Sequence, residues 1–196
     1  MSDSWYEEIE PGTKLMQGDL IFGCPLVSWK SEALQVSGSG DTEVLHTMTE
    51  AILADTVVMT QACDLDQDKV QNVVLCPHIT VTEYFDAWRT EMQSKGNNPT
   101  NKAWRSHCEV ICDGFIWNLA LLNAGKTLTL GTEHRIVDFH DIFTVPRTFL
   151  EALLRQRGQQ RLRLLPPYRE HLSQAFARFF VRVGLPTPVS AIWQGR

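Results

Sequence analysis

The sequence predicts an α+β protein: a small antiparallel sheet core with a helical insertion and a C-terminal two-helix module. Short runs rich in Val and Thr, bounded by turn-forming residues, recur through the first 144 residues and indicate buried strands. Residues 82–112 change to helical spacing, and the last third repeats apolar residues on one helical face. We therefore divide the chain into a β-rich core, 1–144, and a basic helical module packed on it, 145–196.

The centre of the predicted core is a pair of apolar runs at residues 56–60 and 73–76. The polar segment between them is too short for a crossover helix, so the two strands are expected to be antiparallel. This pairing places Gln61, Cys63 and Asp64 in a turn of functional interest, directly after the first strand.

The segments before this pair predict one strand and one loop. Residues 20–27 are apolar, and Pro25 cannot donate to a central ladder, so we expect a strand with a bend or bulge at Gly23. Residues 37–41 are Gly- and Ser-rich and indicate a loop tip. Residues 47–54 form a lead-in to the strand at 56.

The segments after the pair begin with a helix predicted to run to about residue 94, because Tyr84, Phe85 and Trp88 share one face. A second amphipathic segment follows at 103–112. Residues 114–122 are compatible with a strand or with a buried helix. Further short strands are expected where residues 127–130 alternate and at 135–139.

The C-terminal third predicts two helices. The first begins at Pro146 and ends near Gly158, and the second runs from the Pro pair at 166–167 to about residue 183. The second helix has one apolar face. Its other face carries His171, Gln174, Arg178 and Arg182.

Charge divides the chain unevenly. Residues 1–144 carry 9 Lys and Arg against 21 Asp and Glu, a net charge of −12, whereas residues 145–196 carry 9 Arg against 2 Glu, a net charge of +7. Such a tail is expected to dock on nucleic acid, on a partner protein or on the chain's own acidic body. The candidate nucleic-acid or partner-binding residues are Arg161, Arg163, Arg169, Arg178 and Arg182.

Metal and cofactor sites are not indicated by the residue spacing. Zinc ligand types are present, but no Cys-x-x-Cys pair occurs, and isolated core cysteines explain the pattern better. A calcium loop starting at Asp64 would need Gly and Glu where Lys69 and Leu75 stand. No Gly-rich phosphate loop is present, so we expect no cofactor. The weak zinc candidates are Cys63, Cys76, His78, His107, Cys108 and Cys112.

A nucleophilic role is conceivable for Cys63 if a histidine activates it. The candidate partners are His78, His107 and His171, and no local signature selects among them. A packed thiol at the end of a strand is the simpler interpretation.

Three stretches together resemble the MazF/PemK family of small SH3-like barrels. Residues 18–21 are similar to the Gly-Asp-Ile opening of the first strand in that family. Residues 56–60 resemble the apolar strand that ends in Ser or Thr, and residues 73–80 resemble the following strand with its terminal Pro-Ile-Thr. The resemblance covers residues 18–80 and implies an SH3-like β-barrel.

The same resemblance implies a ribonuclease site, but one that has lost a part. Family ribonucleases carry an Arg-Pro pair before the second apolar strand, where this chain has Ala54 and Asp55. Thr80 alone matches the active-site hydroxyl, and a hydroxyl without a charge-stabilising group is a poor catalyst. A divergent enzyme would need a surrogate arginine such as Arg89 or Arg105.

We therefore expect a non-catalytic binding or adaptor protein of the cytoplasm, connected with a bacterial toxin–antitoxin or defence system. The alternatives are a divergent endoribonuclease and a nucleic-acid-binding regulator that uses the C-terminal arginines. A protein partner is expected, and nucleic acid and a homodimer are further candidate partners. No apolar run is long enough to span a bilayer, and no secretory signal is evident at the N-terminus.

Overall fold

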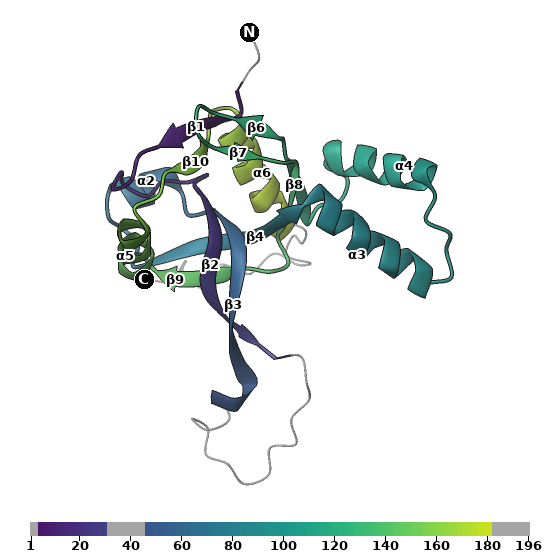
Figure 1. Ribbon diagram of the computed structural model, residues 1–196, viewed down its shortest axis with the longest axis horizontal. Coiled ribbons are helices and arrows are strands. Elements are labelled where there is room, and N and C mark those ends of the chain that lie inside the picture. Colours follow the sequence, from purple (N-terminus) through teal and green to yellow (C-terminus); the bar gives the residue numbers. More distant parts are fainter. Residues whose placement is uncertain (1–3, 31–45, 182–196) are drawn as a thin grey trace, which may run out of the picture.

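A computed structural model describes residues 4–30 and 46–181 of the chain (Figure 1). The strands are β1 (Tyr6–Ile9), β2 (Leu20–Trp29), β3 (Thr49–Val58), β4 (Asn72–Thr80), β5 (Leu119–Leu122), β6 (Gly125–Lys126), β7 (Gly131–Thr132), β8 (Arg135–Asp138), β9 (Phe143–Pro146) and β10 (Arg161–Leu164). The helices are α2 (Ala62–Asp66), α3 (Val81–Ser94), α4 (Asn101–Cys112), α5 (Arg147–Arg157) and α6 (Tyr168–Phe180).

A six-stranded antiparallel sheet forms the centre of the fold, in the order β2-β3-β4-β8-β5 with β9 also paired to β4. The antiparallel pairing predicted for the two central runs is confirmed, because Val57 faces Cys76 across β3 and β4. The α+β class is also confirmed. Within the described residues the strands do not close into a barrel, since β2 and β5 are the two ends of this order.

The predicted irregularity at Gly23 is confirmed. The register between β2 and β3 shifts between Ile21 and Cys24, and Gly23 has a φ of 56°, a left-handed conformation that favours glycine. The Gly23 backbone N–H, displaced from the ladder, donates to the Asp55 carboxylate at 2.8 Å. The bulge therefore fixes the position of Asp55 on the neighbouring strand.

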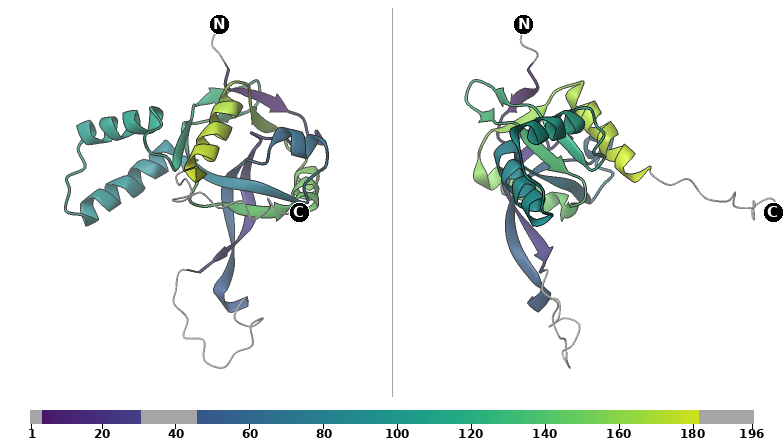
Figure 2. Two further views of the ribbon diagram at one scale, coloured as in Figure 1. Left: turned by 180° about the vertical axis from the view of Figure 1, so that it is seen from behind. Right: turned by 90° about the vertical axis from the view of Figure 1, so that its right-hand side faces the viewer.

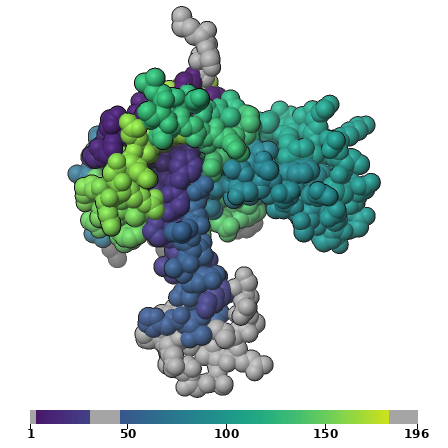
Figure 3. Space-filling model, viewed as in Figure 1, coloured from purple at the N-terminus to yellow at the C-terminus, as the bar shows by residue number. Residues whose placement is uncertain are grey.

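Two elements project from this body. The outer halves of β2 and β3 form a two-stranded ribbon, and α3 and α4 form a helical hairpin on another side (Figure 1). The space-filling view shows both standing clear of the body (Figure 3). The predicted loop tip at residues 37–41 lies outside the described residues.

The body has a hydrophobic core on each face of the sheet. One cluster gathers Tyr6, Leu20, Val57, Phe139 and Leu172, and so joins β1 and α6 to the sheet. Figure 2 shows α6 lying against the sheet on this side. The other cluster joins α2 and α5 to the opposite face; its members include Ile21, Val58, Leu65, Val145 and Leu150.

Both helices of the predicted insertion are present. Trp88, which is 7% exposed, packs with Trp104 across the hairpin at a ring-centroid distance of 5.1 Å. Phe85 meets Trp104 edge-on at 4.8 Å, and His107 stacks near Trp88. These aromatic contacts join the first half of α3 to α4.

The C-terminal third contains more β-structure than the sequence predicts. Both helices are found, α5 between Pro146 and Gly158 and α6 from Tyr168, but strand β10 lies between them and pairs with β1. The proposed boundary at 144/145 falls inside β9, which belongs to the central sheet. Residues 161–164 form a strand because Leu162 and Leu164 alternate with the arginines, so one face enters the core.

Two local predictions are decided by the structure. Residues 127–130 do not form a strand, because they make the turn between β6 and β7, and Leu128 is 98% exposed. Residues 114–122, which were compatible with a strand or a helix, end in strand β5, and the four residues of this strand pair with β8. No helix within the described residues is long and apolar enough to cross a bilayer.

Candidate binding site

Thr80, which the sequence suggested as a candidate active-site hydroxyl, caps helix α3. Its hydroxyl donates to Glu83 Oε2 at 2.8 Å and accepts from the Glu83 backbone N–H at 3.1 Å. The Glu83 carboxylate also accepts from the Thr80 backbone N–H, and these bonds hold the pKa of Glu83 below its usual value. This reciprocal capping box explains why the helix begins here, and it occupies the hydroxyl.

The arginine nearest to Thr80 in the fold is one that sequence reasoning missed. Arg135 lies directly opposite Thr80 in the β4–β8 register. The expected surrogates, Arg89 and Arg105, are exposed on the projecting hairpin. Asp55 was the available signal, because an acid within an apolar run needs a cationic partner from elsewhere in the chain.

Arg135 is held by several internal partners. Its Nη1 donates to Asp55 Oδ2 at 2.8 Å and to His78 Nδ1 at 2.9 Å. Its Nε donates to Thr132, and the guanidinium lies 4.8 Å from the centroid of the Phe22 ring. The side chain is only 11% exposed. We call Asp55, His78 and Arg135 the buried polar cluster.

His78 is neutral in this cluster at physiological pH. Burial, together with the neighbouring Arg135 charge, lowers the pKa of His78 to about 4. Since Nδ1 accepts from Arg135, the ring proton is assigned to Nε2. Nε2 is buried and has no hydrogen-bond partner within the described residues. A neutral, enclosed imidazole of this kind cannot readily exchange protons with a substrate.

Two of the candidate binding arginines lie inside the protein. Asp19 is completely buried, and its carboxylate accepts from Arg161 Nε at 2.8 Å and from both Nε and Nη2 of Arg163. Arg161 and Arg163 also donate to backbone carbonyls before β2. Part of the basic tail therefore docks on the chain's own acidic body, one of the three expected targets.

The other candidate arginines differ in their surroundings. Arg169 pairs with Glu170 at 2.7 Å, and Arg182 lies outside the described residues. Arg178 is exposed on α6 and has no ion-pair partner in the part of the chain that the structure describes. Among the four candidate arginines that the structure describes, it is therefore the one whose charge is available to a ligand.

The turn after β3 contains the short helix α2, which carries Cys63 and Asp64 and has Gln61 as its N-cap residue. The exposed Cys63 thiol lies 3.8 Å from Gln61 Oε1 and 3.8 Å from Asp64 Oδ1. Among the described residues these are its polar contacts, and neither is a histidine. The structure does not bring Cys63 into hydrogen-bonding contact with an activating base.

The candidate metal ligands are dispersed. Cys76 is buried in β4, where burial raises the pKa of its thiol to about 12 and so disfavours the thiolate that binds metals. His78 belongs to the buried polar cluster, and Cys108 and Cys112 lie on α4. No group of three His, Cys, Asp or Glu side chains within residues 4–30 and 46–181 is arranged to hold a metal ion.

A groove runs between α6 on one side and the end of α4 with β5 on the other. Its larger part is a cavity of about 530 Å³, within the range typical of ligand sites. Its floor is apolar, formed by the buried side chains of Ile111, Leu119, Leu122 and Leu172. At one end Trp5 stacks on Tyr168 with ring centroids 4.0 Å apart.

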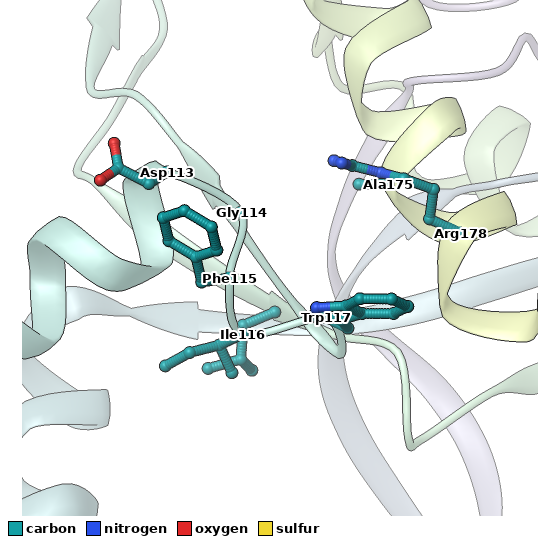
Figure 4. A pocket seen from close by; sticks show the side chains of 8 residues that line it. Asp113, Gly114, Phe115, Ile116, Trp117, Ala175 and Arg178 are labelled. Carbon is teal, nitrogen blue, oxygen red and sulfur yellow. The ribbon is translucent and has the colours of Figure 1, made fainter. Parts of the chain in front are cut away.

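A second, smaller pocket of about 200 Å³ continues the groove beyond Arg178. Phe115 and Trp117 line it and remain 70% and 49% exposed. Figure 4 shows Arg178 extending from α6 toward the turn that holds these two residues, while the Asp113 carboxylate points away. The two pockets share Gly114, Leu119, Ala175 and Arg178, so they meet at the arginine.

Comparison with known proteins gives no relative from which a function could be transferred. No protein-family model, no curated protein and no solved structure matches the chain.

Proposed function

We propose that this is a non-catalytic binding or adaptor protein of the cytoplasm. The observation that carries the proposal is that the groups a ribonuclease would need are already bonded within the protein: the Thr80 hydroxyl caps α3, and the Arg135 guanidinium is bound to Asp55 and His78. The Thr80 hydroxyl and the Nη1 and Nε atoms of Arg135 therefore already have partners, and the Arg135 side chain is only 11% exposed, which disfavours their use in stabilising charge on a substrate.

Exposed apolar side chains support the binding part of this proposal. Leu53, Val27 and Trp29 on the projecting ribbon are 75%, 68% and 62% exposed, and Phe115 is 70% exposed beside the groove. Large apolar side chains gathered on projecting elements are typical of surfaces that contact other proteins. The resemblance to MazF/PemK proteins suggests a toxin–antitoxin or defence system as the setting.

Affinity capture from host lysate tests the proposal when it is performed with and without nuclease. A partner protein that copurifies in stoichiometric amounts after nuclease treatment, and that binds the full-length chain when both are purified, is the expected result. Copurification of RNA or DNA alone would contradict the proposal. The ribbon variant Leu53→Ser serves as a second bait and reports whether that surface takes part.

A divergent endoribonuclease is the second candidate, because the register places Arg135 opposite Thr80. In this alternative Arg135 leaves Asp55 when RNA binds and stabilises the developing phosphate charge. The alternative predicts RNA cleavage that Thr80→Ala abolishes. The nucleic-acid regulator is weakened as a candidate, since Arg161 and Arg163 are buried with Asp19.

A further inference from the structure

The groove beside α6 has one cationic group between two apolar pockets. The larger pocket lies toward Trp5 and Tyr168, and the smaller one lies toward Phe115 and Trp117. Arg178 lines both. A ligand that fills the groove must therefore pass the guanidinium, and it must place apolar groups on each side of it.

The guanidinium lies close to the turn after α4. A Cβ added at Gly114 would lie 3.4 Å from Arg178 Nη2, so the side chain spans from α6 to the turn after α4. Gly114 has a φ of 71°, which favours glycine there. Within the described residues no carboxylate pairs with Arg178, and an unpaired guanidinium over apolar walls favours an anionic ligand.

We propose that this groove binds a peptide segment of a partner protein in which an acidic residue stands between two bulky apolar residues. The acidic side chain pairs with Arg178, and the apolar side chains fill the two pockets. The inference rests on the proposed adaptor function and adds the chemistry of the partner to it.

The shape of the groove favours a peptide over a compact ligand. Tyr168 and Arg178 are ten residues apart on α6, so the larger part of the groove is roughly 15 Å long. An extended segment of about five residues covers that length at roughly 3.3 Å each. A nucleic acid would require a row of unpaired cations along the groove, and among the described residues that line it Arg178 is the one Arg or Lys side chain.

Selection from a displayed library of random peptides, with the full-length protein as bait, tests this inference. We expect enriched peptides to carry Asp or Glu flanked on both sides by Leu, Ile, Phe or Trp. Fluorescence anisotropy with the best peptide should show a loss of affinity of at least about tenfold in Arg178→Glu. Changing the acidic residue of the peptide to Lys should restore binding to that variant, which also shows that the variant is folded.

Arg105→Glu is the matched control, because Arg105 is equally exposed but lies on the projecting hairpin. It should bind the peptide as the unaltered protein does. Failure to enrich any peptide, enrichment without an acidic residue, unchanged affinity in Arg178→Glu, or no restoration by the charge exchange would each overturn the inference. A partner captured from lysate that binds Arg178→Glu normally would overturn it too, while leaving the adaptor function intact.

Discussion

At the residue scale, Asp19 determines that two arginines of the C-terminal third are buried in the protein. In the sequence it precedes an ordinary strand, yet in the fold it is enclosed by Arg161 and Arg163, which are 5% and 10% exposed. A carboxylate with two guanidinium partners compensates the desolvation of all three groups. The candidate arginines could be found from the sequence, but their burial could not, because Asp19 and Arg161 are more than 140 positions apart.

Replacing Asp19 with Asn should strongly destabilise the protein. The change leaves two buried guanidinium groups facing a neutral amide, which typically costs about 3–5 kcal/mol. Urea unfolding followed by circular dichroism measures this cost. The control is Asp66→Asn, whose carboxylate is 68% exposed in its pair with Lys14 and should contribute less than about 1 kcal/mol. Equal unfolding midpoints for the two variants would contradict the structural role of Asp19.

His78 should make the protein sensitive to mild acid. Its pKa is about 4 in the folded state and 6.5 in the unfolded chain, so above pH 6.5 both states are neutral and the residue has no effect. Below pH 6.5 the unfolded chain binds a proton that the folded protein does not. The free energy of unfolding should therefore fall between pH 6.5 and 4, by about 3 kcal/mol in full.

The variant His78→Gln should lose this dependence on pH. Urea midpoints measured across that interval should change less steeply in His78→Gln than in the unaltered protein. His140→Gln, which removes a histidine that is 61% exposed, is measured alongside as the control for the loss of a surface histidine. The same slope in all three proteins would show that His78 is not held neutral by its surroundings.

At the scale of elements, residue spacing predicted the helices and the bulge, and it failed for strands whose pairing partner is distant in the sequence. The helices α3 and α4 follow from aromatic residues at helical intervals, and the Gly23 bulge follows from Gly and Pro within an apolar run. Residues 127–130 alternate as a strand would, but no strand lies beside them and they form a turn. Strand β10 was missed because its partner β1 begins at residue 6.

The helical hairpin should loosen when Trp104 is replaced by Ala. Trp104 contacts Phe85, Trp88, Tyr84 and His107, so its removal leaves a cavity between the two helices. Hydrogen exchange read by mass spectrometry should show faster exchange in α3 and α4 and unchanged exchange in β3 and β4. Lys102→Ala, on the exposed side of α4, should change neither. Equal acceleration throughout the sheet would contradict an independently opening hairpin.

At the scale of the whole molecule, the charge division of the sequence is only partly a surface property. The tail that carries +7 in the sequence uses Arg161 and Arg163 inside the body, while Arg147 pairs with Asp68 and Glu151. Arg178 is exposed and has no ion-pair partner among the described residues. Charge counts alone could indicate an anionic target, and the fold shows that the acidic body is part of that target.

The resemblance expected from the sequence pointed to Thr80, and the fold places Arg135 opposite it in the β4–β8 register. Asp55, where that resemblance would require an Arg-Pro pair, instead accepts from Arg135, 80 residues later in the chain. The groove had no signal in the sequence except Arg178, because its walls come from α4, β5 and α6. Sites assembled from distant elements in this way become visible only when the topology is known.

The most direct test of the non-catalytic assignment is incubation of single-stranded RNA with the purified protein. We expect the RNA to remain as intact as in buffer, and Thr80→Ser, which retains the helix cap, to behave identically. Time-dependent cleavage by the unaltered protein that is lost in Thr80→Ala would contradict the account and would favour the divergent endoribonuclease.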